Sequence, residues 1–216
     1  MTSGFLNDLP LYASGLLTTL TVSLAGIALS VGIGIVLAAA LRSPLLYISL
    51  PVRLYVEFTR GAPLTLVLFL IYYGGPQFGL VLNPYVAGVV GLGLYGAGTF
   101  AEIFRAGFNA VPKGEIEAAD MLGLTPGQAF RHIELPQALS LTLPPSIGQA
   151  INLVKESSVL SVITLAELTK VAGTISSITF AVVTPYLTVA LLYWAIVESL
   201  SRLGFYLERR LAVKGY

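Results

Sequence analysis

Long runs without an ionisable side chain are the feature of this sequence that most restricts its fold. No Asp, Glu, Lys, Arg or His occurs in four stretches, residues 9–41, 61–101, 135–154 and 171–197. About 20 apolar residues in a helix cross the roughly 30 Å of hydrocarbon in a bilayer. Lipid offers no partner to an unpaired backbone group, so a spanning segment must satisfy its own amides. The sequence therefore predicts an all-α, polytopic membrane protein.

The composition supports this prediction for the whole chain. Only 11% of the 216 residues are charged, whereas soluble domains carry about 25%. No stretch is polar enough to form a separate soluble lobe, so we expect residues 1–216 to form a single transmembrane domain surrounded by lipid. The net charge of +1 gives no reason to expect nucleic-acid binding.

Five membrane spans are expected from the apolar runs and the turn signals between them. They follow an interfacial lead-in at residues 1–13, and their approximate positions are residues 15–41, 52–73, 85–106, 138–160 and 185–203. A polar insert at residues 111–136 separates the third span from the fourth. A connector rich in Ser and Thr at residues 164–178 precedes the fifth span.

The distribution of basic residues predicts the orientation, because cytoplasmic loops carry an excess of Lys and Arg. With five spans, the loop after the first span, the polar insert and the C-terminus share one side of the membrane. That side collects Arg42, Lys113, Arg131, Arg209, Arg210 and Lys214. The opposite side has only Lys170. We therefore expect the N-terminus outside, and the insert and the C-terminus in the cytoplasm.

The polar insert has the capping signals of two short helices. Pro112 suits a first turn, Glu117 lies where the helix dipole favours an anion, and Gly123 suits the C′ position. The sequence Thr-Pro-Gly-Gln at residues 125–128 has capping-box spacing, and Leu135-Pro136 is expected to end the second helix. The residues alone leave two interpretations open. The insert is either an interfacial hairpin that only joins two spans or a rigid element that contacts a cytoplasmic partner.

The spacing inside the insert resembles the EAA loop of permease subunits in binding-protein-dependent ABC importers. The residues that carry this likeness are Glu117, Ala118, Ala119, Gly123, Ile133, Leu135 and Pro136. Other stretches resemble the polar amino-acid subfamily of these permeases (His, Glu, Gln, Arg and opine-type), namely residues 15–20, 55–63, 101–107, 155–158 and 208–210. The chain departs from this subfamily at Ala62, where Thr is frequent, and at Gly98-Thr99, where an Ala-Tyr pair is frequent. Side-chain selectivity therefore does not carry over.

The resemblance implies the fold and partners of a type I ABC importer, with a MetI-like permease fold in a bacterial cytoplasmic (inner) membrane. Two permease subunits, identical or related, would pair with two ATP-binding subunits and an extracytoplasmic solute-binding protein. ATP and Mg²⁺ would be bound by the ATPase subunits and not by this chain. The seven EAA residues above would couple the chain to the ATPase, and the spans would carry an amino acid by alternating access.

Ionisable residues within predicted spans are costly in lipid and usually face a cavity or a partner. Arg53, Glu57 and Arg60 fall at i, i+4 and i+7, and Glu102 and Arg105 fall at i and i+3. These spacings permit neutral pairs that only hold helices together, which is the alternative to a role in transport. A similar i, i+4 pair, Glu198 with Arg202, lies near the end of the fifth span.

Lys155 and Glu156 are adjacent, so on a helix they point about 100° apart and at least one faces a different neighbour. A zwitterionic amino acid needs donors and acceptors of both signs, and these two residues with the following serines supply them. We assign eight residues to the substrate pathway: Glu57, Arg60, Thr99, Glu102, Lys155, Glu156, Ser157 and Ser158.

No catalytic residue, metal site or cofactor is expected in this chain. The sequence has no Gly-Lys pair, which excludes a P-loop of the usual pattern. One His and no Cys leave only an all-oxygen metal site open. Besides the importer, the sequence allows an ion-coupled secondary amino-acid carrier, in which Glu57, Glu102 or Glu156 would bind protons or Na⁺.

Overall fold

The computed structural model of the protein describes residues 2–212, and every regular element in that part is helical. Three helices are long and apolar enough to cross a membrane, namely Asn7–Leu41, Pro84–Asn109 and Val183–Arg210. Two bent helix pairs raise this number to five if each pair is one span. The predicted all-helical membrane fold is confirmed, and the prediction of five spans agrees with the higher number.

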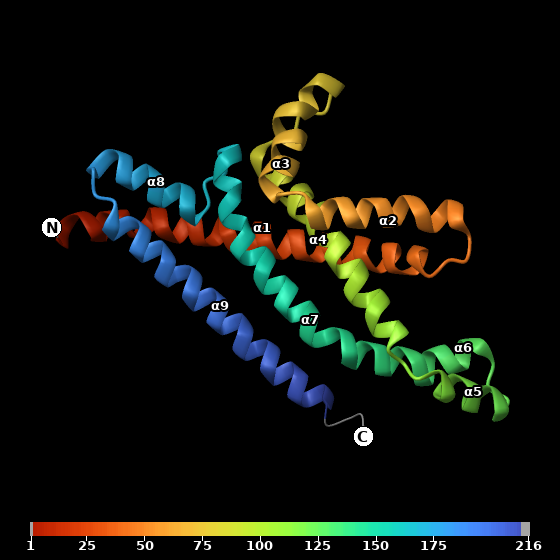
Figure 1. The fold of residues 1–216 in the computed structure, drawn as a ribbon. Helices are drawn as coiled ribbons and strands as arrows, with labels where there is room; N and C mark the ends of the chain where they lie inside the picture. The colour runs from red at the N-terminus through yellow and green to blue at the C-terminus, as the bar shows by residue number, and fades with distance from the viewer. Residues whose placement is uncertain (1, 213–216) are drawn as a thin grey trace.

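Helices α1 (Thr2–Leu41) and α4 (Pro84–Asn109) cross at the centre of the molecule and make its most extensive contact (Figure 1). Their backbones approach closely because small residues lie between them. A Cβ added at Gly34 would lie 2.7 Å from the Cβ of Phe100. Helix α1 also includes residues 2–13 of the expected interfacial lead-in. That expectation was wrong in its boundary, because the helix continues without a break and packs Tyr12 against α8 (Leu168–Thr179).

The second predicted span is not one helix. Helix α2 (Leu46–Gly61) lies beside the C-terminal half of α1, and α3 (Leu64–Phe69) turns away from it (Figure 1). The bend between the two helical segments is 111°. Pro63 explains the bend, since proline disfavours the α conformation in the preceding residue, and Ala62 is extended with ψ of 139°. The π-turn η1 (Leu70–Gly74) and the 3₁₀ turn η2 (Gly75–Phe78) complete this segment.

The polar insert forms α5 (Lys113–Met121) and α6 (Pro126–Ala129). The second helix does not end at Leu135-Pro136 as we predicted. It continues through a π-turn, η3 (Phe130–Glu134), into α7 (Leu135–Glu156). A proline ring clashes with the carbonyl four residues earlier in an α-helix, and a wider turn before Pro136 avoids this clash. The second half of the insert, from Pro126, is therefore a helical extension of the fourth span.

The prediction of a Ser/Thr-rich connector at residues 164–178 is also wrong, because most of this segment is helix α8. The 3₁₀ turn η4 (Ser157–Ile163) ends α7, and Thr164 in the left-handed region begins the turn into α8, which is bent by 48° from the preceding helical segment. Glu167 then caps α8, whose residues Leu168, Val171, Ala172 and Ile175 are buried at helical spacing. Helix α9 (Val183–Ala212) follows and runs alongside α7, with which it is in contact (Figure 1). Lys214 of the predicted basic tail lies outside the described residues.

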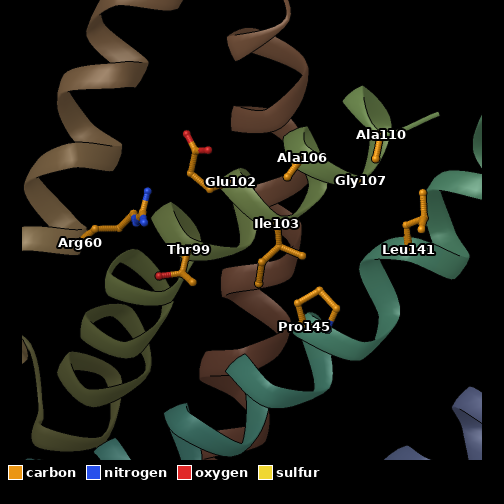
Figure 2. Close-up of a pocket in the computed structure, with 9 residues that line it drawn as sticks. All are labelled: Arg60, Thr99, Glu102, Ile103, Ala106, Gly107, Ala110, Leu141 and Pro145. Atoms are coloured by element: carbon orange, nitrogen blue, oxygen red, sulfur yellow. The ribbon is translucent and has the colours of Figure 1, made fainter. Parts of the chain in front are cut away.

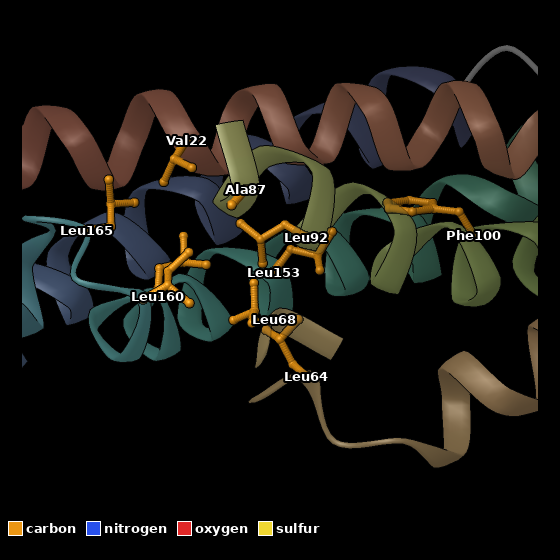
Figure 3. Close-up of a cluster of buried hydrophobic side chains, with 10 residues drawn as sticks. Val22, Leu64, Leu68, Ala87, Leu92, Phe100, Leu153, Leu160 and Leu165 are labelled. Atoms are coloured by element: carbon orange, nitrogen blue, oxygen red, sulfur yellow. The ribbon is translucent and has the colours of Figure 1, made fainter. Parts of the chain in front are cut away.

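The main hydrophobic core joins α1, α3, α4, α7 and η4 (Figure 3). It consists of aliphatic side chains and one aromatic ring: Val22, Leu64, Leu68, Ala87, Leu92, Phe100, Leu153, Leu160, Ile163 and Leu165. Burial of a Leu or Phe side chain contributes about 1.5–3 kcal/mol. This core therefore holds α4 and α7 against α1 and leaves α5 and α6 projecting at one end of the molecule (Figure 1).

Candidate functional site

The EAA segment (residues 111–136) has a well-defined turn between its two helices. Gly123 has φ of +76°, a conformation that glycine adopts without steric cost. The Gly123 N–H donates to the carbonyl of Asp120 at 2.9 Å, and the Leu124 N–H donates to that of Ala119 at 3.1 Å. These two bonds form a Schellman motif. The C′ position predicted for Gly123 is confirmed.

Helix α6 begins with the capping box that the sequence predicted. The Thr125 side chain accepts a hydrogen bond from the Gln128 N–H, and the Gln128 side chain accepts one from the Thr125 N–H. Both ends of the turn are thus closed by local hydrogen bonds. The two short helices consequently keep a defined angle although few of their side chains are buried.

The exposure of the EAA residues divides them into two faces. Ala119 is buried, and Ile133 and Leu135 are half-buried. Glu117, Ala118, Gly123 and Pro136 are exposed. Beside them, Met121 and Leu122 have exposed fractions of 88% and 81%. Adjacent exposed apolar side chains bordered by polar residues are one mark of a surface that contacts another protein or a membrane.

A cavity of about 470 Å³ lies where α2, α4 and α7 meet (Figure 2). Arg60 reaches it from α2, and Thr99 and Glu102 reach it from α4. The remaining lining side chains are small or apolar: Ile103, Ala106, Gly107, Ala110, Leu141 and Pro145. The structure thus brings three of the eight predicted pathway residues into one cavity, with a cation, an anion and a hydroxyl among them.

At Gly98-Thr99 the chain differs from the Ala-Tyr pair that is frequent in the polar amino-acid permeases, and the packing of α4 explains the glycine. A Cβ added at Gly98 would come within 2.0 Å of the Thr59 hydroxyl oxygen on α2, so α2 and α4 touch at this position. Thr59 is buried and donates its hydroxyl to the Tyr55 carbonyl at 3.0 Å. The close contact leaves the neighbouring Thr99 to face the cavity.

A second cavity, of about 600 Å³, shares Arg60 and Glu102 with the first. Six charged residues line it: Arg42, Arg53, Glu57, Arg60, Glu102 and Arg105. Arg105 and Glu102 form the predicted ion pair at 2.7 Å. Among the described residues Glu57 and Arg60 form no ion pair, so the alternative in which these two residues only neutralise each other is not borne out. The predicted pair of Arg202 with Glu198 is confirmed at 2.7 Å.

The remaining pathway candidates lie outside both cavities. Lys155 and Glu156 end α7, and Ser157 and Ser158 begin η4. Lys155 is exposed and Glu156 half-buried, whereas Ser157 is buried. The structure therefore separates the eight residues into a group at the cavities and a group at the α7–η4 junction.

A buried polar network at this junction was missed by sequence reasoning. The Tyr193 hydroxyl on α9 donates to Glu167 at 3.0 Å and lies 3.4 Å from the Ser157 hydroxyl. Glu167 is fully buried and accepts from the N–H groups of Thr169 and Lys170, both at 2.7 Å. A capping residue followed by apolar residues at helical spacing was the signal that could have revealed it.

A second missed contact is the ion pair between Arg42, after α1, and Glu134 in the EAA segment. The described residues contain no group of three or more His, Cys, Asp or Glu side chains arranged to hold a metal ion.

Comparison with known proteins agrees with this geometry. A family model described as "Binding-protein-dependent transport system inner membrane component" matches residues 30–213. The probable glutamine ABC transporter permease protein GlnM of Bacillus subtilis (strain 168) is 39% identical over 208 residues, which cover 95% of each chain. The arginine transport system permease protein ArtQ of the same organism is 33% identical and covers 97% of this chain and 96% of its own length.

Solved structures have the same fold. The crystal structure of an amino acid ABC transporter with histidines contains a chain that is 37% identical, with a TM-score of 0.90 and coverage of 96% of this chain and 97% of that one. An inward-facing structure of the MetNI methionine ABC transporter is similar in fold, with 22% identity, a TM-score of 0.79 and coverage of 93% and 96%. The resemblance seen in the EAA spacing is thereby confirmed. The chain belongs to the family of inner membrane components of binding-protein-dependent transport systems, as a permease subunit and not an enzyme.

Proposed function

We propose that this chain forms the translocation pathway of an ATP-driven amino-acid importer and is coupled to a cytoplasmic ATPase through its EAA segment. The observation that carries the coupling is the exposed tip of α5, where Met121 and Leu122 project beside Glu117. The Schellman turn at Gly123 keeps this tip rigid, so a partner that moves α5 moves α7 with it. Relatives named as glutamine and arginine permeases support an amino acid as the substrate.

The proposed assembly contains two permease subunits, two ATP-binding subunits that hold ATP and Mg²⁺, and an extracytoplasmic solute-binding protein. The EAA segment and the C-terminus face the cytoplasm, as the distribution of Lys and Arg supports, and the N-terminus lies outside. The whole chain, residues 1–216, acts as one membrane domain with residues 111–136 as its coupling loop.

The proposed pathway runs through the cavity lined by Arg60, Thr99 and Glu102. A guanidinium and a carboxylate on one wall match the carboxylate and the ammonium group of a zwitterion. The apolar side chains opposite accept substrate side chains without specific contacts. A second part of the route is formed by Lys155, Glu156, Ser157 and Ser158 at the α7–η4 junction. Glu57 belongs to the part of the route that passes the second cavity.

The test is purification of this subunit from membranes that also contain the ATPase and the solute-binding protein encoded beside it. ATP hydrolysis by the reconstituted complex is then measured with a panel of amino acids. Copurification of the ATPase and stimulation by one amino acid would support both the coupling and the substrate class. Uptake that follows a proton or Na⁺ gradient without ATP would favour the ion-coupled secondary carrier instead.

A further inference from the structure

Arg42 connects three elements that are far apart in the sequence. It follows α1 directly, and its Nη2 donates to Oε1 of Glu134 in η3 at 2.5 Å. The guanidinium carbon also lies 4.8 Å from the ring centroid of Phe108, near the end of α4. A guanidinium has a planar face and a fork of donors, so it serves both contacts at once.

The Phe108 ring extends this contact to the beginning of η3. It stacks on Phe130 with a centroid distance of 5.9 Å and an angle of 11° between the ring planes. Phe130 is the first residue of η3 and Glu134 is the last. The Arg42 cluster (Arg42, Phe108, Phe130 and Glu134) therefore holds the π-turn at both of its ends.

The position of η3 gives this attachment a mechanical consequence. The helix from α6 through η3 into α7 is continuous, so a displacement of α5 and α6 passes along it to α7. The Arg42 cluster is a second connection, because it joins the same turn to the ends of α1 and α4. A π-turn is an uncommon, wider helical turn that is frequent at functional sites.

Arg42 also borders the second cavity, together with the predicted pathway residues Glu57, Arg60 and Glu102. The residue that holds the EAA segment is thus part of the wall of this cavity. Burial distinguishes its ion pair from a surface pair. The Glu134 side chain is 13% exposed and that of Arg42 38%, against 42% and 79% for Glu198 and Arg202.

We propose that Arg42 is a positioning residue of the transport cycle, which conveys displacement of the EAA segment to the α1 and α4 wall of the second cavity. This inference rests on the proposed coupling to an ATPase. A contact that only stabilised the fold would change the amount of folded protein. Arg42 in the proposed role changes the amount of substrate moved for each ATP hydrolysed.

The test uses the complete reconstituted transporter and measures uptake and ATP hydrolysis in the same vesicles. We expect Arg42→Gln to lower the ratio of substrate transported to ATP hydrolysed about fivefold or more, the lower end of typical coupling between sites. Arg42→Lys should fall between this variant and the wild type, since an ammonium keeps the charge without the planar fork. Glu134→Gln, which preserves the shape of the side chain, should resemble Arg42→Gln.

Arg202→Gln is the matched control, because it removes an ion pair between two residues of α9, a helix that packs on α7 and α8. Its transport ratio should equal that of the wild type. An unchanged ratio in assembled Arg42→Gln, or in Glu134→Gln if Arg42→Gln does not assemble, would overturn the inference and leave the proposed function intact. A wild-type complex without substrate-stimulated hydrolysis would instead overturn the proposed function, and this inference with it.

Discussion

Replacement of Glu167 by Ala is expected to destabilise this permease more than the loss of an ordinary helix cap. The carboxylate accepts three hydrogen bonds, from the N–H groups of Thr169 and Lys170 at 2.7 Å and from the Tyr193 hydroxyl at 3.0 Å. The residue is 0% exposed, so water does not replace the acceptor when it is removed.

The magnitude follows from these three bonds. Loss of an N-cap costs about 1 kcal/mol. The Tyr193 hydroxyl also loses its hydrogen bond to a charged acceptor, worth about 1.5–3 kcal/mol, and keeps only the longer contact of 3.4 Å with the Ser157 hydroxyl. Alanine also relieves the desolvation of a buried carboxylate, which brings the expected loss of stability to roughly 2 kcal/mol. For a chain of this size, such a loss lowers the midpoint of thermal unfolding by roughly 4–8 °C.

Fluorescence of the chain's one tryptophan measures this transition in the purified subunit, since Trp194 follows Tyr193 directly. The control is Asn83→Ala, because Asn83 caps α4 at an exposed position through one bond of 2.9 Å from the Val86 N–H. That variant should lower the midpoint by only about 2–4 °C. Equal shifts for Glu167→Ala and Asn83→Ala would refute the argument that the buried network adds to the cap.

Three further changes test the packing, the turn and the pathway. Gly34→Ala should lower the free energy of unfolding by about 1–3 kcal/mol, because the new Cβ meets Phe100. Gly32→Ala should not lower it, because Gly32 has open space around it. Equal losses in thermal unfolding would contradict the packing argument. Gly123→Leu places a bulky side chain at φ of +76°, so ATP hydrolysis should continue with less uptake, and normal coupling would remove this residue from the mechanism. Glu156→Gln should raise the KM for uptake about tenfold; unchanged affinity, maximal rate and substrate-stimulated hydrolysis would exclude it from the pathway.

Features that depend only on residues close in the sequence could be predicted from the sequence. The uncharged runs predicted the spanning helices, and the spacing from Thr125 to Gln128 predicted the capping box. Gly123 was recognised as a C′ residue because the turn that it makes closes over adjacent residues. Glu102 and Arg105 lie on successive turns of one helix, so their ion pair also followed from the spacing.

The predictions from the sequence fail where a local signal is overridden by packing between distant parts of the chain. Leu135-Pro136 predicts a helix end, yet η3 widens the helix and the chain continues into α7. The Ser and Thr content after Thr164 predicts a connector. Glu167 instead caps a helix there, and the hydrogen bond from Tyr193 on α9 and the buried apolar face of α8 stabilise that helix. Hydropathy is an average over a window, so it did not reveal the bend at Ala62-Pro63 inside one apolar run.

The sequence by itself thus determined that the chain spans a membrane, how the turn of the EAA segment is capped, and which family it resembles. Only the tertiary structure decided that Arg60 and Glu102 share a cavity and that Arg42 pairs with Glu134, 92 positions away. Local hydrogen bonds and capping depend on residues within about one helical turn. Contacts between distant residues depend on how whole helices pack, and that packing is set by the combined burial of many side chains.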